Sequence, residues 1–461
     1  MMEFEREFEI DLDSFIVNYK IEKGITHSAN RMFKMLPFVA NDNKVVTDFK
    51  GVLGAFVRLI NEKQSKVVFN KEEFFERLYK IVDFEEEEQK EVLKNIIEKT
   101  ILNDEELAIF NLRSLNYIKS ESGDEKIAKF LYSLLQGENV LDECKNVFIE
   151  NDDNVLYQLV FNVLPELATV NVKDDLYYCS LPYVKELFAK DLKTIIKDKD
   201  LLQGTLQRVL EYYYFFYISQ LSIKLNKFED ADLTVTDTVF FTLSWESTSK
   251  KRQAYILGWE YLKKQIENLF SHTITLELLN YNKSGLKMDY VKLGKYLKEC
   301  NENQVAEEIR NLRQTYSEAV SNSLKDFDLE VLDEKINDGI EEVHSLFKTV
   351  EYQFQNSTRK RAYEAYRNWF VYFTQANFGK RRGALGYNLN LTEEDIILFT
   401  KIITQQQGGR IRLNTLFSEL EKRGMCFDKF SKASIVELYE KLNLLEKKSD
   451  SGDAQYVRSI L

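Results

Sequence analysis

Proline and glycine are scarce in this chain, which has only three prolines and 17 glycines in 461 residues. Because both residues interrupt helices and populate turns, their scarcity favours long helices over a sheet with many turns. With 44% hydrophobic and 13% aromatic residues, the chain can bury a sizeable core divided among about two to four domains. We therefore predict a globular, mainly α-helical protein.

Histidine and cysteine are also few, with three and four residues. The cysteines lie far apart, without the close pairs of a zinc site or the framework of a disulfide-bonded domain. A reducing cytoplasm is therefore the expected location. No glycine-rich loop followed by Lys-Ser or Lys-Thr occurs, which excludes the usual nucleoside triphosphatase motif. The sequence predicts no catalytic residue, no metal, no cofactor and no small-molecule substrate.

Long apolar runs are missing too. The longest uncharged stretches, such as residues 212–223, cover about a dozen residues, too few to cross a hydrocarbon layer of ~30 Å. The first fifteen residues are acidic, whereas a secretory signal is basic and then apolar. We expect a soluble, cytoplasmic protein without a membrane partner.

Positive charge is in deficit, since the formal net charge is −12. Proteins that coat nucleic acid are usually basic, because phosphate neutralisation supplies most of their affinity. Any contact with double-stranded DNA must therefore use a local basic patch or a partner protein. The strongest concentration of cations lies between residues 356 and 383, where Glu364 is the one acid. Its seven cations are Arg359, Lys360, Arg361, Arg367, Lys380, Arg381 and Arg382.

Aromatic residues are interleaved with these cations, and two interpretations follow. Helical spacing places Tyr366, Trp369 and Phe370 on one side and Arg367 off it, as expected for a buried face with surface cations. Alternatively, the cations form a phosphate-contacting patch that leads into the C-terminal segment. Cations that follow a helix end, as residues 380–382 would, are also favoured by the helix dipole.

Residues 1–378 are predicted to form a mostly helical body, with residues 1–65 as a candidate separate N-terminal segment. The aromatic run 212–217 has apolar residues on nearly all faces of its helix, which indicates a central core element. Residues 230–249 are rich in β-branched and aromatic residues, which predicts a short hairpin or an irregular insertion. Residues 379–390 are predicted as a basic connector.

Four consecutive acids, Glu85 to Glu88, lie between two helical patterns. Consecutive helix positions fan out around the axis, so these carboxylates cannot converge on one cation. The run is therefore interpreted as a solvated helix start, where the helix dipole favours negative charge.

The C-terminal segment, residues 391–461, has the most specific order of signals. Thr392 precedes a polar first turn and Asp395 follows three residues later, which is the spacing of a capping box at a helix start. Residues 410–413 alternate polar and apolar, as a short strand does. Asn414 is expected to open a second helix.

Gly424 is expected to end this second helix, because a left-handed residue is favoured there. Ser431 is expected to cap a third helix, and residues 444–448 and 454–461 have the pattern of strands. The residues between them are turn formers, which predicts a hairpin. Helix, strand, helix, helix and hairpin, in this order, predict a winged helix-turn-helix after the large helical body.

The charge of the C-terminal segment is balanced, with eleven Lys or Arg and eleven Asp or Glu. Its third helix would present Glu437 and Glu440 on the exposed side, where carboxylates repel phosphate. Lys447 and Lys448 in the predicted hairpin are the remaining candidate DNA contacts. We predict that the segment serves protein contact at least as much as DNA contact.

Six short segments carry a family resemblance. They are Thr26–Ser28, Phe33–Pro37, Lys380–Tyr387, Lys422–Gly424, Phe427–Ser431 and Leu442–Val457. These segments resemble the G component of the Dpt (Dnd-associated) DNA phosphorothioation-dependent restriction system. The resemblance implies a non-catalytic accessory subunit of a bacterial anti-phage complex that attacks DNA lacking the phosphorothioate mark. In that family ATPase and cleavage chemistry are attributed to the companion F and H components, which this chain would bridge.

Two other functions stay open. A winged-helix transcription regulator would need a basic recognition helix and usually a dimer. A cryptic metal-dependent nuclease would combine Glu446 and Lys448 with an aspartate such as Asp428. At the other end of the chain, His27 and Ser28 lack a carboxylate that would orient the imidazole as a base. A packed surface loop recognised by a partner is the preferred interpretation there.

Overall fold

The computed structural model describes residues 8–21, 25, 27, 30–38, 45–64, 69–150, 153–171, 175–299, 302–325, 327, 338–357, 360–447 and 455–459. Across these residues it has 19 α-helices and only short strands. This confirms the predicted mainly α-helical class. None of the described helices combines the length and the apolar character needed to span a lipid bilayer.

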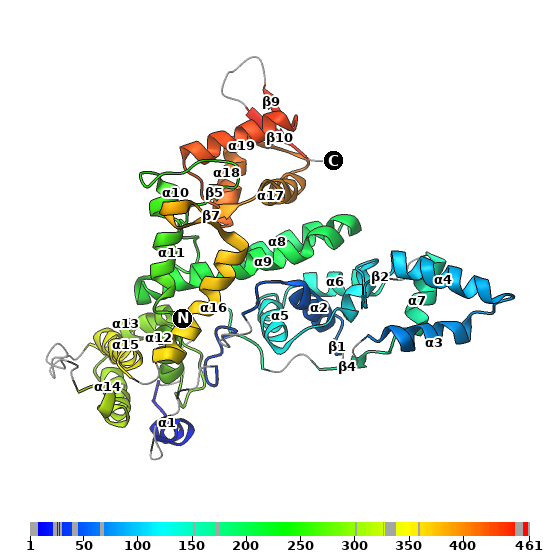
Figure 1. The fold of residues 1–461 in the computed structure, drawn as a ribbon. Coiled ribbons are helices and arrows are strands. Elements are labelled where there is room, and N and C mark those ends of the chain that lie inside the picture. Colours follow the sequence, from blue (N-terminus) through cyan, green and yellow to red (C-terminus); the bar gives the residue numbers. More distant parts are fainter. Residues whose placement is uncertain are drawn as a thin grey trace.

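Helix α9, Lys199–Leu225, runs through the centre of the molecule (Figure 1). The side chains of its aromatic run, residues 212–217, are at most 2% exposed. Buried tyrosines need partners for their hydroxyls, and Tyr212 and Tyr213 donate to the carbonyl of Arg423 and the carboxylate of Asp191, both at 2.6 Å. The sequence-based prediction of a central core helix is confirmed.

One group of helices packs beside α9. Helices α2 and α5 pack closely against each other and both contact α9. A Cβ on Gly54 of α2 would lie only 2.9 Å from the carbonyl oxygen of Ile118, so glycine permits this close approach. The elements are α2, Lys50–Ile60; β1, Lys63–Gln64; η2, Leu112–Tyr117; α5, Ser122–Leu134; α6, Val140–Ile149; β4, Ala168–Thr169, antiparallel to β1; and α8, Pro182–Ile195.

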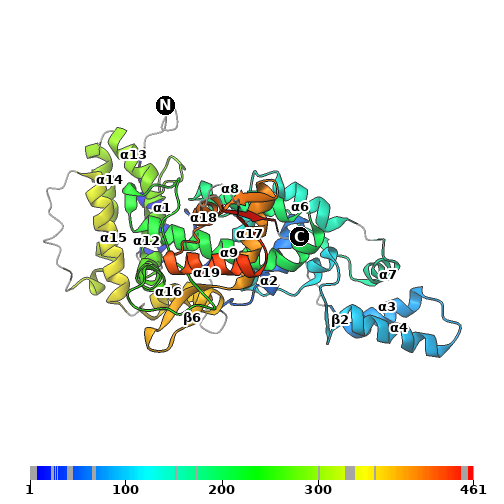
Figure 2. The same cartoon turned by 90° about the horizontal axis from the view of Figure 1, so that it is seen from above.

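A helical arm projects from this group in both views (Figures 1 and 2). Its residues Phe74, Leu78, Ile97 and Val160 belong to a hydrophobic core that is separate from the main core. From the sequence, one mostly helical body was predicted for residues 1–378. Hydrophobic periodicity identifies helices but does not show which hydrophobic core each helix joins. The elements are α3, Lys71–Ile81; α4, Glu87–Thr100; β2, Leu102–Asn103, antiparallel to β3, Glu106–Leu107; and α7, Val155–Val163.

Another group of helices lies at the far end of the molecule from the arm (Figure 1). Within it α12 packs against α15, and α14 packs against α15. The elements are α1, Leu12–Tyr19; η3, Phe228–Asp230; α10, Gln253–Ile256; α11, Trp259–Ile266; α12, Leu269–Leu279; α13, Tyr290–Glu299; α14, Glu302–Ala319; η4, Ser321–Ser323; and α15, Gly339–Gln355.

The described parts of residues 1–65 contact two different groups of helices. The N–H of Asp11, which precedes α1, donates to the carbonyl of Tyr281 after α12 at 2.7 Å, whereas α2 packs against α5. Phe15 and Val52 nevertheless belong to the same main core. These contacts could not be predicted from the sequence, because local patterns do not report which distant helix an amphipathic face meets.

Residues 379–390 form more than the predicted connector. They follow α16, Lys360–Phe378, and contain β6, Gly379–Arg381, and η6, Gly383–Leu385, before β7, Tyr387–Leu391. Strand β6 pairs antiparallel with β7, and β5, Thr242–Leu243, pairs with β7 in parallel. Of the two structures predicted for residues 230–249, the irregular insertion is confirmed and the local hairpin is not, since the segment is mostly irregular and β5 pairs with a strand far along the chain.

The C-terminal segment contains three helices and a three-stranded antiparallel sheet with the strand order β8-β10-β9. Thr392 and Asp395 form the predicted capping box, and Gly424 has the predicted positive φ of 80°. The third helix begins earlier than predicted, because Asp428 and not Ser431 caps it. The turn between β9 and β10 lies outside the described residues. The elements are α17, Glu393–Gln406; β8, Arg410–Arg412; α18, Leu413–Lys422; α19, Lys429–Lys441; β9, Leu445–Lys447; and β10, Gln455–Arg458.

Candidate partner and nucleic-acid interface

The basic segment proposed as a DNA contact is divided along α16. Lys360 and Arg361 are exposed at the start of this 19-residue helix, which is ~28 Å long at 1.5 Å per residue. Residues 380–382 follow its other end, in β6 and directly after it. Arg359 lies outside the described residues. Five of the described cations therefore form two groups at the two ends of α16, and Arg367 lies between these groups within the helix.

Lys380 and Arg382 are engaged with the turn that follows β5. The ammonium of Lys380 donates to the carbonyl of Ser244 at 2.5 Å. The guanidinium of Arg382 donates to the carbonyls of Glu246 and Leu243 at 2.8 and 2.7 Å, and burial lowers its pKa. Arg381, between them, is exposed. Of these three cations, only Arg381 is exposed.

The aromatic side of α16 faces the core. Trp369, Phe370 and Phe373 are at most 2% exposed, and the Phe373 and Tyr214 rings meet edge to face with centroids 4.9 Å apart. This confirms the interpretation that the aromatics are core. Arg367 is half-buried and its Nε donates to Asn368 at 3.3 Å.

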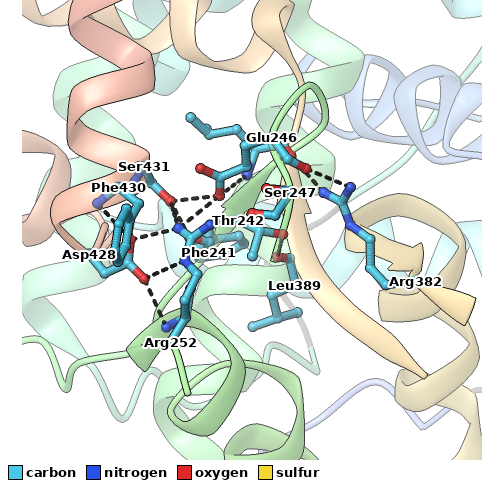
Figure 3. Close-up of polar contacts among 12 residues, drawn as sticks. Phe241, Thr242, Glu246, Ser247, Arg252, Arg382, Leu389, Asp428, Phe430 and Ser431 are labelled. Carbon is cyan, nitrogen blue, oxygen red and sulfur yellow. Dashed lines mark hydrogen bonds and ion pairs between the residues drawn. The ribbon is translucent and has the colours of Figure 1, made fainter. Parts of the chain in front are cut away.

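A buried polar network holds the start of α19 to the turn after β5 (Figure 3). Arg252 donates to both carboxylate oxygens of Asp428, at 2.9 and 2.6 Å. Glu246 accepts from Arg252 at 3.1 Å and from the Ser431 hydroxyl at 2.7 Å. Burial alone would raise the pKa of Asp428, but Arg252 and the N–H of Ser431 outweigh it and the pKa is lowered. We call the contact between Arg252 and Asp428 the first anchor of the C-terminal segment.

The second anchor joins α8 to the end of α18. Arg423 and Asp191 are both fully buried, and the guanidinium donates twice to the carboxylate, at 2.6 and 2.8 Å. Gln406 donates to the same carboxylate at 2.9 Å, as does the Tyr213 hydroxyl at 2.6 Å. Burial acts to lower the pKa of Arg423, but Asp191 outweighs burial and the pKa is raised.

The third anchor joins α9 to α17. Arg208 donates to both carboxylate oxygens of Asp395, at 2.6 and 2.9 Å. Asp395 is also the residue that completes the capping box of α17. One carboxylate thus fixes the start of α17 and attaches it to the central helix. Together the three anchors attach all three helices of the C-terminal segment to the rest of the chain.

The exposed side of α19 is of mixed charge, as predicted. Lys429 and Lys441 are exposed, and so are Glu437 and Glu440, whereas Lys432 forms an ion pair with Glu421 at 2.8 Å. Phe430 is 54% exposed near the start of the helix. Carboxylates on such a face oppose phosphate binding.

The remaining predicted DNA contacts lie in the hairpin. Lys447 is in β9, where its backbone pairs with Gln455 of β10, and its side chain lies outside the description. Lys448 lies outside the described residues. A groove of about 960 Å³ lies between α8, α18 and α19, with Leu187 and Phe427 among its lining residues. It gives the C-terminal segment a concave surface beside the body.

The residues considered for catalysis have structural contacts. Asp428 is held by Arg252, and Glu446 pairs with Arg410 of β8 at 2.8 Å. His27 forms a hydrogen bond with the Tyr316 hydroxyl at 2.7 Å, and Ser28 lies outside the described residues. Within the described ranges, no three His, Cys, Asp or Glu side chains converge as metal ligands would.

The segment around Phe33 is packed against the core, while Arg31 within it is exposed. Phe33 and Met35 are fully buried. The carboxylate of Glu277 on α12 accepts the N–H of Met32 at 2.7 Å and that of Phe33 at 3.0 Å. A buried carboxylate needs such donors. The sequence near residue 277 does not indicate that Glu277 will accept hydrogen bonds from the N-terminal part of the chain.

Comparison with family models and with curated proteins finds no match for this chain.

Sequence reasoning missed the three anchors. Each pairs an arginine with an aspartate from a different part of the chain, and isolated charged residues give no local signal of such a pair. Arg423 gave no stronger signal than the others, because the burial of the glycine that follows it is visible only in the structure. In the structure, the packing of the elements that carry these residues brings each arginine within hydrogen-bond distance of its aspartate.

Proposed function

We propose that this chain is a non-catalytic scaffold subunit of a bacterial phosphorothioation-dependent DNA restriction complex. It would bridge the F and H components, to which the family resemblance attributes the ATPase and cleavage chemistry, and bring them to double-stranded DNA in the cytoplasm. The proposal combines that resemblance with the arrangement of the C-terminal segment on the helical body.

We further infer that the C-terminal segment is a winged helix-turn-helix. What supports this is the order α17, β8, α18, α19, β9, β10 together with a sheet in which β10 lies between β8 and β9. In such modules the third helix and the hairpin are the usual contact surfaces. The balanced charge on the exposed side of α19 favours protein as the main contact.

One observation carries the scaffold proposal: three arginine–aspartate anchors, two of them buried and the third partly buried at Arg208, tie the C-terminal segment to the body. Removing one partner of a buried pair is costly, typically ~3–5 kcal/mol, so the segment has little freedom to move against α8 and α9. A recognition module mounted in this way holds its partner at a fixed position relative to the arm and the far helices. That is the property a bridging subunit needs.

The proposal is tested by co-expressing the full chain with the F and H components and measuring complex mass by size-exclusion chromatography with light scattering. We expect one complex that contains all three proteins, and no direct F–H complex when this chain is omitted. Purified chain that associates with neither companion would contradict the proposal.

The two alternatives give different outcomes in the same preparation. A transcription regulator would bind one DNA sequence tightly without companions, and a cryptic nuclease would nick DNA in the presence of a divalent metal. Glu446→Gln would abolish that nicking. The same substitution would leave complex formation with the F and H components intact.

A further inference from the structure

The negative charge of the chain is concentrated on the arm. Residues 71–107 contain thirteen Asp or Glu and six Lys or Arg, a net charge of −7 out of −12 for the whole chain. The arm has its own small core and extends away from the rest of the molecule (Figure 2). More than half of the net charge is therefore carried by a projecting part.

The outer end of the arm also exposes apolar side chains. We call residues 81–96, the end of α3, the turn and the first part of α4, the acidic tip. Ile81, Val92 and Ile96 there are 53%, 59% and 44% exposed. Val92 and Ile96 are one helical turn apart, while the neighbouring Ile97 is fully buried in the arm core. Helix α4 is thus apolar on the side of its core and also on part of its outer side.

Capping of α4 explains only some of the carboxylates of the acidic tip. Glu86 is the N-cap residue and Glu87 and Glu88 lie in the first turn, where the helix dipole favours them. Glu87 also pairs with Lys90 at 2.9 Å. Five exposed carboxylates of the acidic tip have no ion pair within the described structure. They are Asp83, Glu85, Glu86, Glu88 and Glu91.

We propose that the acidic tip docks a basic amphipathic helix of a partner protein. The apolar side chains of that helix would cover Val92 and Ile96, and its Lys and Arg residues would meet the surrounding carboxylates. Charge complementarity selects this occupant, because such a field repels DNA and acidic proteins and attracts basic ones. This inference concerns a surface that the proposed scaffold function does not assign.

The test uses the full chain and a labelled amphipathic helical peptide of Leu and Lys, with a shuffled peptide of the same composition as reference. Fluorescence anisotropy at low salt should show tighter binding of the amphipathic peptide. Substituting Glu85, Glu86, Glu88 and Glu91 together by Gln should weaken binding about tenfold, as the loss of several screened ion pairs would. Val92→Ser with Ile96→Ser should remove the preference for the amphipathic peptide.

A matched control removes the same charge elsewhere. Glu260, Glu267, Glu307 and Glu318 are exposed on the far helices and have no ion pair among the described residues. Their joint substitution by Gln should leave peptide binding unchanged, and circular dichroism should show intact helices in every variant. Equal binding of both peptides, or equal effects of tip and control variants, would overturn the proposal. So would self-association of the chain through Val92 and Ile96, measured by sedimentation.

The companions separate this inference from the proposed function. If the wild-type chain binds F and H and the acidic-tip variants lose one of them, both proposals are supported. If neither companion binds, the scaffold function fails and the peptide experiment still decides the docking surface. If companions bind all tip variants normally and the peptide binds them normally too, the docking surface alone is discarded.

Discussion

At the scale of single residues, Asp191 and Arg423 show how strongly one buried charge depends on another. Both side chains are fully buried, and Tyr213 and Gln406 complete the coordination of the carboxylate. Replacing Asp191 by Asn removes the closer counter-charge of the guanidinium and leaves only the ion pair with Glu419 at 3.2 Å. We expect the free energy of unfolding to fall by ~3–5 kcal/mol, measured by chemical denaturation.

The matched control is Glu143→Gln, which removes an exposed ion pair with Lys193 on the same helix as Asp191. Exposed pairs contribute ~0–1 kcal/mol, so this variant should unfold near the wild-type midpoint. An equal decrease in the free energy of unfolding in the two variants would mean that the buried pair contributes no more to stability than the exposed pair.

His272 provides a pH-dependent test. It is fully buried, stacked on Phe347, and burial lowers its pKa to about 3. Because the unfolded chain binds a proton near pH 6.5 and the folded chain does not, stability is complete above that pH. It falls by up to ~1.4 kcal/mol per pH unit as the pH drops from about 6.5 toward 3. His272→Gln should lose this part of the pH dependence between pH 7 and 5, measured from urea midpoints. Parallel pH profiles for the two proteins would contradict it.

At the scale of elements, two neighbouring cations of β6 have different roles: Lys380 is structural and Arg381 lies on the surface. Lys380 donates to the carbonyl of Ser244, whereas Arg381 is exposed. Lys380→Glu should therefore lower the melting temperature, because a carboxylate cannot donate to that carbonyl. Arg381→Glu should leave the melting temperature unchanged and weaken low-salt retention of double-stranded DNA, reducing the salt slope by about one.

Lys298→Glu serves as the control for the charge change, since Lys298 is exposed on α13 and lies outside the candidate DNA contacts. Unchanged DNA retention by the Arg381 variant would remove the basic segment from the candidate contacts. A folded and fully stable Lys380 variant would show that its contact with the turn after β5 contributes nothing.

Local signals predicted the C-terminal elements well. The capping box at Thr392, the strand near Ile411 and the left-handed Gly424 each depend on a few neighbouring residues. The misplaced cap at Ser431 shows the limit of such signals. Both Asp428 and Ser431 are good caps by type, and the choice between them depends on Arg252, which lies far away in the sequence.

Long-range pairing could not be predicted in the same way. Strand β5 is two residues long and pairs with β7 in parallel, so no turn links the two and no hairpin pattern exists. Likewise, a count of cations predicted one patch in residues 359–382, yet Lys380 and Arg382 bind carbonyls after β5. Composition gives the charge of a segment but not the direction of each side chain.

At the scale of the whole molecule, the two hydrophobic cores differ greatly in size. The arm core is small, whereas the main core extends from Phe8 to Val457. Regions with few buried contacts open at lower free energy. In hydrogen exchange with mass spectrometry, α3 and α4 should therefore exchange through partial opening at denaturant concentrations where α9 stays protected. Exchange of arm and α9 amides in one cooperative step would contradict this.

The central position of β10 has a consequence for how the chain is assembled and handled. Strands β8 and β9 do not pair with each other, and β10 joins them, although it follows both in the sequence. During synthesis β8 and β9 leave the ribosome before Gln455–Arg458, so their edges stay unpaired until β10 has been made. Truncation before Gln455 would remove the central strand of this sheet and leave the edges of β8 and β9 unpaired and open to aggregation.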